Sequence, residues 1–462
     1  MIFPSKRIRK AIIIRNLCLF ATLYGLLFAA PTLAQNLRLT GFYKQQFSLQ
    51  LPQPNEILDA RNTVRFDASR GLSQGELNIT TDLNNDLLNP IDSLGIRLRE
   101  AYFTWYLKNG DLTVGRQIIS WGRSDIAFLT DILSPIDLRN FLTVDTFDAR
   151  FGVDAASYTH YFGRNYLQLV VNPSPQGFIL PSPNSRWFPQ DLFPEQLPVR
   201  YERANVEPEW DDIQVATRFA LRSDLTYELE AGVMYWRYPM ASYFKTVSTT
   251  QAGPVAIPDG LLLRETYLQS LIATLSGLYR ASDRLLIYAE GAYYRQRYFD
   301  FLPVDITNLN INNIAIDDLI NLSQLLNQAN NGFLVKKPWI GAMGGLQYTL
   351  FDWLLRLQYV GEVILNYEDP ILQERYFDYL SLTAQRSFFR ERLNVQVLSR
   401  FQRLNNDFWI NANLTYDATD AFDVTLGGNI FGGEPGDNFS GHLNFDDFEN
   451  NSMVFLRTAV YF

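Results

Sequence analysis

Along most of the chain, hydrophobic and polar residues alternate with a period of two. At the start of this pattern, for example, Leu37 and Leu39 alternate with Arg38 and Thr40. Successive side chains of a β-strand point to opposite faces, so the alternation predicts strands with one apolar and one polar face. A helical period is confined to one short stretch, residues 317–328. The sequence therefore predicts an all-β protein.

The alternating runs predict about eighteen strands. They begin near residues 37, 60, 76, 96, 111, 149, 164, 211, 225, 264, 284, 336, 353, 374, 391, 406, 421 and 452. The links between these strands alternate in length. The short links lie near 70–75, 108–110, 163, 223–224, 281–283, 351–352, 389–390 and 417–420. The links between them are mostly longer and lie near 50–59, 85–95, 120–148, 173–210, 239–263, 300–335 and 432–451. Short turns at one end and long, extracellular loops at the other are typical of transmembrane barrels. We therefore expect a transmembrane antiparallel β-barrel.

The polar face of the strands carries many charges, which argues against the alternative of a soluble β-sandwich or propeller. The charged residues at polar strand positions are Arg218, Glu228, Glu230, Glu290, Arg356, Glu362, Arg386, Arg400 and Arg457. Burying so many ions in a dry protein core would be prohibitive. We expect them to line a hydrated lumen, inside a closed sheet that leaves no unpaired edge in hydrocarbon.

Residues 1–34 have the features of a secretory signal peptide. A basic segment without acidic residues precedes an apolar stretch from Leu17 to Ala30, and a cleavage site of small residues ends at Ala34. The alternative, a membrane anchor, is disfavoured because about 14 apolar residues are short for a span of roughly 20. We expect cleavage after Ala34, which leaves residues 35–462 as the barrel domain.

The last residues of the chain predict a partner and a location. Tyr461 and Phe462 end an alternating strand and resemble the C-terminal assembly signal of bacterial outer-membrane barrels. We therefore expect recognition by the barrel-assembly machinery through Phe462. After Sec export, the protein is predicted to lie in the bacterial outer membrane, in contact with lipid and lipopolysaccharide.

Composition and charge exclude other classes of function. The net charge of -9 and the pI near 5.0 would repel nucleic-acid phosphates. Cys18 is the only cysteine and lies in the predicted signal peptide, so no disulfide or cysteine-bound metal is expected. His442 lies in a long loop, and His160 is three residues from Ser157, hence on the opposite face of a strand. We predict no catalytic triad, no enzyme activity, no cofactor and no metal.

A barrel of this size cannot fill its interior with strand side chains, so loops must narrow it. The best candidate is the connection from Ser120 to Asp148. We predict that the pore and its constriction are lined by Arg116, Arg123, Asp125, Asp131, Asp137, Arg139, Arg218, Glu228, Glu230, Glu290, Arg356, Glu362, Arg386 and Arg400. Arginine and carboxylate rows that face each other would create a transverse field that admits small polar solutes. The alternative role of each residue is an ion pair that stabilises the wall.

Arg116 departs from the alternation. Leu112 and Val114 give Arg116 the parity of the lipid-facing side. It lines the lumen only if a bulge near Gly115 turns it inward. The same break in the alternation occurs around Arg97, Arg99 and Ala101.

Five motifs lie between residues 98 and 138. They are Leu98-Arg99-Glu100-Ala101-Tyr102, Gly115-Arg116-Gln117, Trp121-Gly122-Arg123-Ser124-Asp125, Asp131, and Ser134-Pro135-Ile136-Asp137-Leu138. This segment resembles one shared by alginate-export-type outer-membrane proteins and related uncharacterised barrels. The resemblance implies a barrel of similar strand number that passes an anionic polysaccharide or another polar solute. This chain departs from a mostly arginine lumen, because the acids Glu228, Glu230, Glu290 and Glu362 accompany the arginines.

The most consistent function is an outer-membrane, porin-like channel for passive passage of polar or anionic solutes, small saccharides among them, with polysaccharide export as one form. An alternative is a transporter of hydrophobic compounds, which would need an apolar pocket, a plugging N-terminal segment and a lateral opening. The charged strand faces and the early first strand argue against this alternative. An outer-membrane enzyme is a third, weaker alternative.

Overall fold

The computed structural model describes residues 37–51, 56–88, 95–124, 127–143, 146–182, 185–188, 199–202, 212–223, 226–252, 255–301, 332–435 and 444–462. The predicted signal peptide (1–34), the short helical stretch (317–328), Asp125 and His442 lie outside these residues.

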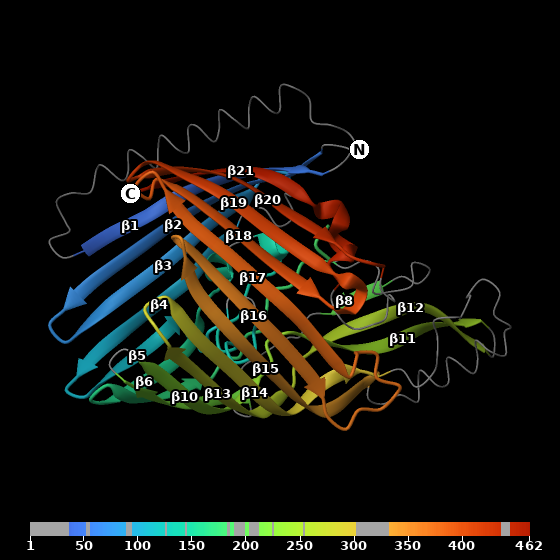
Figure 1. Cartoon of the computed structure of the whole chain (residues 1–462). Coiled ribbons are helices and arrows are strands. Elements are labelled where there is room, and N and C mark those ends of the chain that lie inside the picture. The colour runs from blue at the N-terminus through green and yellow to red at the C-terminus, as the bar shows by residue number, and fades with distance from the viewer. Residues whose placement is uncertain are drawn as a thin grey trace.

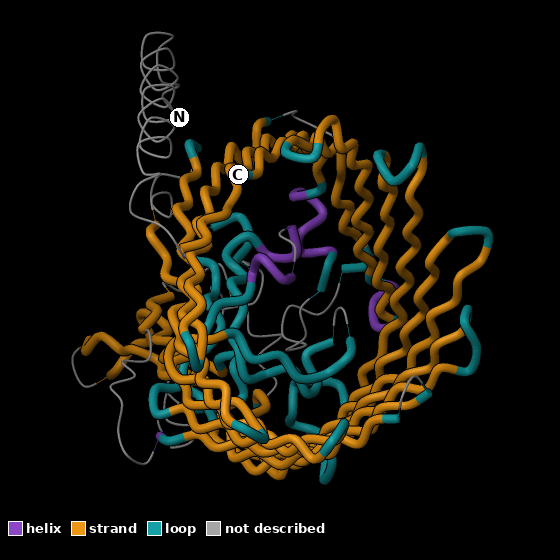
Figure 2. Tube along the Cα trace, turned by 90° about the vertical axis from the view of Figure 1, so that its left-hand side faces the viewer, coloured by secondary structure: helices purple, strands orange, loops and turns teal. Residues whose placement is uncertain are grey.

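Within the described residues, eighteen strands form one closed sheet (Figures 1 and 2). Each strand pairs antiparallel with the next barrel strand in the chain, and β1 pairs with β21 to close the ring. The strands are β1 (Leu37–Gln50), β2 (Ile57–Leu72), β3 (Gly75–Asp86), β4 (Gly95–Leu107), β5 (Gly110–Gln117), β6 (Val153–Phe162), β7 (Asn165–Asn172), β9 (Gln214–Arg222), β10 (Tyr227–Arg237), β13 (Gln269–Arg280), β14 (Leu285–Asp300), β15 (Leu334–Leu350), β16 (Trp353–Ile364), β17 (Tyr376–Phe388), β18 (Leu393–Gln402), β19 (Phe408–Thr419), β20 (Phe422–Gly432) and β21 (Met453–Tyr461). The predicted fold class and strand number are confirmed.

The two ends of the barrel differ as the link lengths predict. One end, the short-turn end, holds tight turns such as the one between β2 and β3. The other, the long-loop end, holds the long connections, with one exception: only residues 403–407 join β18 to β19. The long-loop end also carries a small separate sheet that the sequence analysis assigned to loops. It consists of β8 (Val199–Glu202), β11 (Ser242–Ala252) and β12 (Val255–Thr266), and its hairpin projects from the barrel (Figure 1).

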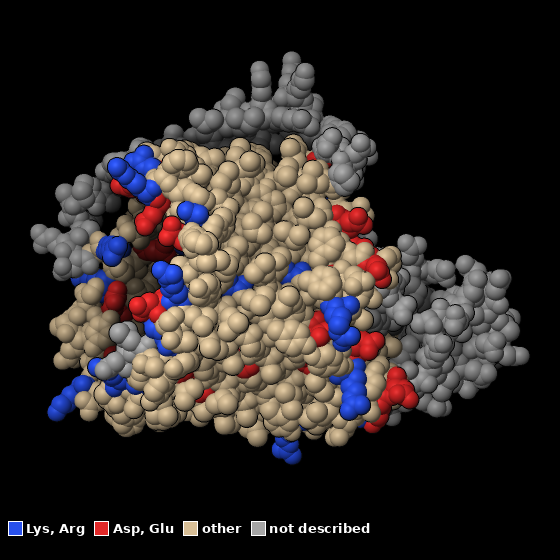
Figure 3. Space-filling view, in the orientation of Figure 1, with Lys and Arg blue, Asp and Glu red and all other residues tan. Residues whose placement is uncertain are grey.

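The outer face of the wall is apolar. Along β13, Leu271, Leu275 and Tyr279 are all exposed, whereas Ile272, which points inward, is fully buried. Figure 3 shows charged side chains gathered mainly toward the two ends of the wall, with few of them in the band between. This alternation of exposed apolar and inward-facing residues is what a strand between hydrocarbon and a lumen requires.

The helices of the described chain are short. They are η2 (Phe141–Thr143), α2 (Thr146–Ala149), η5 (Leu404–Asn406) and η6 (Asp446–Asn451). No helix in the described ranges has the length and apolar character needed to cross a membrane.

Two local irregularities lie in β4 and β5, near the point where the chain leaves the wall. The pairing of β3 with β4 shifts register at Thr80, and the resulting bulge lets both Arg99 and Glu100 bond to groups inside the barrel. In β5, Gly115 has a φ of 124°, and a Cβ there would lie 2.3 Å from the carbonyl oxygen of Ala101. Only glycine fits this position. Two residues later β5 ends, and the chain leaves the wall.

Candidate functional site

The connection between β5 and β6, residues 118–152, runs through the interior of the barrel; we call it the inner loop. Figure 2 shows loops and short helices enclosed by the ring of strands. Where the inner loop rejoins the wall before β6, the backbone N–H of Gly152 donates to the carbonyl oxygen of Arg99 at 2.9 Å. This bond continues the wall next to β4 and closes the gap. The connection predicted from the sequence to form the constriction lies within this loop.

The first limb of the inner loop packs on an apolar patch of the lumen wall. From the loop, Trp121, Leu129 and Ile132 are almost fully buried in this contact. The wall contributes Val170, Ala216, Met234, Trp236, Ile272, Trp339, Met343 and Val360. The charged strand residues were expected to line a hydrated lumen, but in this sector the lumen wall is apolar and is covered by the inner loop. Burial at roughly 25 cal/mol per Å² of apolar surface holds the loop against the wall.

Arg123 ties the first limb to charged residues of β10 and β14. Its guanidinium lies 3.1 Å from Glu228 and 3.9 Å from Glu230. Its backbone N–H donates to Glu290 Oε2 at 2.7 Å. The preceding Gly122 has a φ of 110°, and a Cβ there would lie 2.6 Å from Thr130 Oγ1. Glycine is therefore required for this approach to Glu290.

The remaining partners are arginines of β9. Arg218 Nη1 lies 3.3 Å from Glu230, and Arg222 lies 2.6 Å from Glu228. The Arg218 guanidinium also stacks 5.0 Å from the Trp121 ring, and Tyr166 donates to Glu230 at 2.8 Å. We call Arg123, Arg218, Arg222, Glu228, Glu230 and Glu290 the wall cluster. The structure thus brings together five predicted pore residues.

The geometry of the wall cluster differs from the predicted one. Arginines and glutamates contact each other directly on one sector of the wall, so they do not face each other across an opening. The reason is that β9, β10 and β14 lie close together in the barrel and the inner loop brings Arg123 to them. The cluster therefore fixes the loop and presents its outer charges to the lumen as neutral pairs.

Asp131 joins the two limbs of the inner loop. It accepts hydrogen bonds from Ser120 Oγ at 2.8 Å and from the Trp121 N–H at 3.0 Å, and it forms an ion pair with Arg150. Burial raises the pKa of the Asp131 carboxyl above its usual value, although Arg150 and these hydrogen bonds oppose the shift. Asp131 is thus a structural link inside the loop.

The returning limb is anchored to the opposite sector of the wall. Asp148 lies 2.7 Å from Lys44 Nζ of β1 and 2.9 Å from Arg65 Nη1 of β2. Arg65 in turn forms a two-point contact with Asp82, and the backbone carbonyl of Asp148 accepts a hydrogen bond from Arg99. We call Lys44, Arg65, Asp82, Arg99 and Asp148 the second anchor. Nearby, Asp137 pairs with Arg97 and with Arg139, two residues further along the loop.

Sequence reasoning missed Lys44, Arg65, Asp82 and Arg99 of the second anchor and Arg222 of the wall cluster as site residues. Lys44, Arg65 and Asp82 have the inward parity of their strands, and this parity was the available signal. Their functional position depends on Asp148, which is distant in the sequence and could not be paired with them from parity alone.

The second anchor predicts a response to acid. Burial raises the pKa of the Asp148 carboxyl, but Lys44 and Arg65 outweigh it, so the pKa lies below the ordinary 3.8. The folded state therefore gains stability from this carboxylate above the unfolded pKa and loses it as the pH falls through the folded pKa. Lowering the pH from about 7 to about 3 should weaken the anchor and increase fluctuations of single-channel current.

The Asp148→Asn variant should fluctuate already near neutral pH and respond less to acid. Asp283→Asn, in the exposed turn before β14, is the matched control and should behave as the unmodified protein. Equal acid responses of all three proteins would contradict the assignment.

The other predicted site residues are placed as follows. Arg356 points into the lumen and donates to Gln347 at 2.8 Å. Glu362 and Arg400 also point inward, and Arg400 stacks 3.7 Å from the Tyr379 ring centroid. Asp125 lies outside the described residues.

Two predicted pore residues lie on the outer face instead. Arg116 keeps the parity of the exposed Val114 because β5 stays in register with β4 and β6 through Gly115, and it binds Asp154 at 2.7 and 2.9 Å. Arg386 shares the parity of the exposed Leu382 and reaches the Trp353 and Phe388 rings near the short-turn end. Their assignment to the pore lining is corrected: a long arginine side chain can extend along an apolar wall to a polar partner or to water.

No family model and no curated relative matches this sequence. Among solved structures, the chain resembles Pseudomonas aeruginosa OccK2 in complex with glucuronate, at 9% identity and a TM-score of 0.49, over 92% of this chain and 97% of that one. It also resembles opdK from the same organism, at 7% identity, TM-score 0.49 and 93% and 98% coverage. Salmonella typhi OmpF in complex with daunomycin matches at 11% identity, TM-score 0.43 and 92% and 98% coverage. These are likenesses of fold.

Proposed function

We propose that this protein is an outer-membrane channel through which small polar solutes diffuse, with the inner loop as its constriction. The observation that carries the proposal is the inner loop itself. It crosses the interior of a closed eighteen-stranded barrel and is fixed to β10 and β14 through Arg123 and to β1 and β2 through Asp148. A barrel of this width is too large to be filled by strand side chains, so such a loop sets its free cross-section.

The charges of the lumen favour polar over apolar solutes. Arginine keeps its charge at any physiological pH, and its planar fork binds carboxylates and phosphates at two points. The resemblance of residues 98–138 to alginate-export-type proteins supports saccharides, small anionic ones included, as solutes, with polysaccharide export as the narrower form. The glutamates of the wall cluster neutralise its arginines and favour small solutes over a long polyanion.

A transporter of hydrophobic compounds is less well supported. The apolar lumen patch formed by Met234, Ile272 and Val360 is covered by Trp121 and Leu129 of the inner loop. Its side chains therefore pack against the inner loop and are not accessible to a solute.

The proposal includes an orientation and a route to the membrane. The long-loop end would face the cell exterior and the short-turn end the periplasm. Residues 1–34 would be removed after Sec export, residues 35–462 would form the barrel, and Phe462 would be recognised during assembly in the outer membrane. Lipid and lipopolysaccharide would contact the exposed apolar residues of the outer face, such as Leu271 and Leu275.

Single-channel recording in planar bilayers tests the proposal. We expect steady conductance from the refolded protein. In a mature chain without cysteine, Ser124→Cys places one thiol on the inner loop, 3.2 Å from Gln358 in the unmodified protein. A bulky thiol reagent should then reduce the conductance by about half or more, because the label narrows the constriction.

Ser282→Cys, in the exposed turn between β13 and β14, is the matched control and should be labelled without change in current. Absence of conductance from the folded protein would refute the channel. Equal effects of the two labels would refute the inner loop as the constriction.

A further inference from the structure

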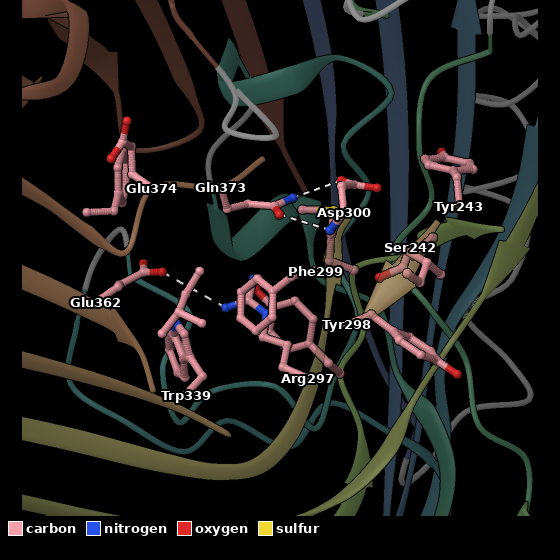
Figure 4. A pocket seen from close by; sticks show the side chains of 16 residues that line it. Ser242, Tyr243, Arg297, Tyr298, Phe299, Asp300, Trp339, Glu362, Gln373 and Glu374 are labelled. Carbon is pink, nitrogen blue, oxygen red and sulfur yellow. Dashed lines mark hydrogen bonds and ion pairs between the residues drawn. The ribbon is translucent and has the colours of Figure 1, made fainter. Parts of the chain in front are cut away.

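A cavity of about 170 Å³ opens at the long-loop end, where β10, β14, β15 and β16 meet the start of β17 (Figure 4). Its lining includes Tyr238, Arg297, Asp300, Trp339, Glu362 and Gln373. One water needs only about 15 Å³ of such space, whereas drug-sized ligands occupy sites of about 300 Å³ or more. The volume therefore suits an occupant about the size of one sugar ring.

Arg297 is held in a fixed position beside this cavity. The pairing of β14 with β15 shifts register between Tyr294 and Arg297, and this bulge redirects the arginine. Its guanidinium lies 4.1 Å from the Tyr238 ring centroid and 4.9 Å from that of Trp339. The Trp339 ring is itself fixed by an edge contact with Tyr294. Because packing already restricts its motion, Arg297 loses little conformational entropy when it binds a ligand.

Glu362 faces Arg297 but does not occupy the N–H donors of the arginine. The nearest nitrogen and oxygen atoms are 3.9 Å apart, which exceeds the length of a hydrogen bond. The side chains of both residues remain about one-fifth exposed, at 21% and 22%. The pair thus presents N–H donors and carboxylate acceptors side by side. The dashed line from Glu362 in Figure 4 marks this ion pair.

The other side of the cavity is rigid and also balanced in charge. Asp300 forms an ion pair with Lys245. Gln373 donates to the Asp300 carboxylate at 2.8 Å and accepts from the Asp300 N–H at 2.9 Å (Figure 4). Asp300 therefore stays in place, and its charge is compensated before any ligand arrives.

We propose that this cavity binds one neutral sugar ring of a solute that enters the channel. The inference rests on the proposed function and specifies its solute class. A hydroxyl both donates and accepts, so neighbouring sugar hydroxyls can bond Arg297 and Glu362 together. A carboxylated sugar would meet the Glu362 charge, and an amino sugar would meet the Arg297 charge, so each would bind more weakly. Phe299 and Phe377 supply apolar contacts for the ring carbons.

Isothermal titration calorimetry on the folded full chain in detergent tests the proposal without requiring conduction. Cellobiose should bind, whereas glucuronate and glucosamine should bind about tenfold more weakly or worse. Glu362→Gln removes the acidic charge and should reverse the preference between cellobiose and glucuronate. Arg297→Gln should move the preference toward glucosamine. The two opposite shifts cannot result from a general loss of structure.

Arg403→Lys is the control, because this arginine is mostly exposed and pairs with Asp378, a residue of the outer-face parity. It should leave all three affinities unchanged. No measurable binding of cellobiose, or a ranking of sugars that neither cavity variant alters, would overturn the proposal. If the protein conducts but does not bind cellobiose, the proposed channel is supported and the sugar site is refuted. If it binds cellobiose but does not conduct, the sugar site is supported and the channel is refuted.

Discussion

Replacing Arg123 with glutamate should make the channel selective for cations. The wall cluster pairs three arginines with three glutamates. The substitution leaves two arginines and four glutamates at the point where the inner loop meets the wall. The excess negative potential raises the local concentration of cations and lowers that of anions. We expect the ratio of cation to anion permeability to rise by about threefold or more.

The reversal potential in a salt gradient measures this effect. Arg123→Ala should shift it in the same direction by a smaller amount, since it removes one positive charge without adding a negative one. Glu228→Gln, which removes a carboxylate from the same ion pair, should shift it in the opposite direction. An unchanged reversal potential in all three variants would show that ions do not pass near the wall cluster. The effect should weaken as salt rises.

The strand pattern of this barrel could be predicted closely because each strand separates two different environments. The eighteen predicted starts fall near the observed ones, for example 336 against Leu334 and 452 against Met453. Exposed residues such as Leu271 and Leu275 alternate with inward ones. The position of a residue in the alternation, however, shows only whether its side chain points inward or outward. It does not show which distant residue that side chain contacts.

The apolar lumen patch shows this limit. In β10, Val233 and Tyr235 point outward, while Met234 and Trp236 point inward and are also apolar. The strand thus loses its polar face at one end. Apolar residues on both faces of a strand indicate that both faces are covered, here by lipid outside and by another segment inside. Nothing in β10 identifies that segment as the inner loop.

Arg116 and Arg386 illustrate a second limit. Both have the parity of exposed apolar neighbours, and we gave their charge more weight than their parity. The structure supports parity in each case: Arg116 binds Asp154 across the outer face, and Arg386 lies near Asp352 of the adjacent turn. Arg99 shows the opposite case: it was left out of the predicted pore residues, yet a bulge in the pairing of β3 with β4 turns it inward, where it bonds Asp148. A bulge is a property of two paired strands, so one strand's sequence does not specify it.

Phe141→Ala should release the tip of the inner loop. The Phe141 side chain is 7% exposed and stacks on Phe448 at 4.4 Å and on Trp187 at 6.0 Å. Truncating a buried phenylalanine costs about 3–5 kcal/mol, and lost aromatic pairs are part of this cost. Because Phe141–Thr143 form a short helical turn outside the barrel strands, part of the loss should appear as local opening. We expect frequent current fluctuations and a lower free energy of unfolding in denaturant.

Phe351 provides an unusually close control for this variant. Both phenylalanines have a φ of 48°, so alanine meets the same backbone strain at either position. Phe351, however, is 81% exposed in the turn between β15 and β16. Phe351→Ala should change stability by about 0.5 kcal/mol or less and leave the current steady. If both variants lose stability equally, the strained backbone is responsible. If only Phe141→Ala does, the aromatic contact across the lumen holds the inner loop closed, and the free cross-section depends on packing as well as on charge.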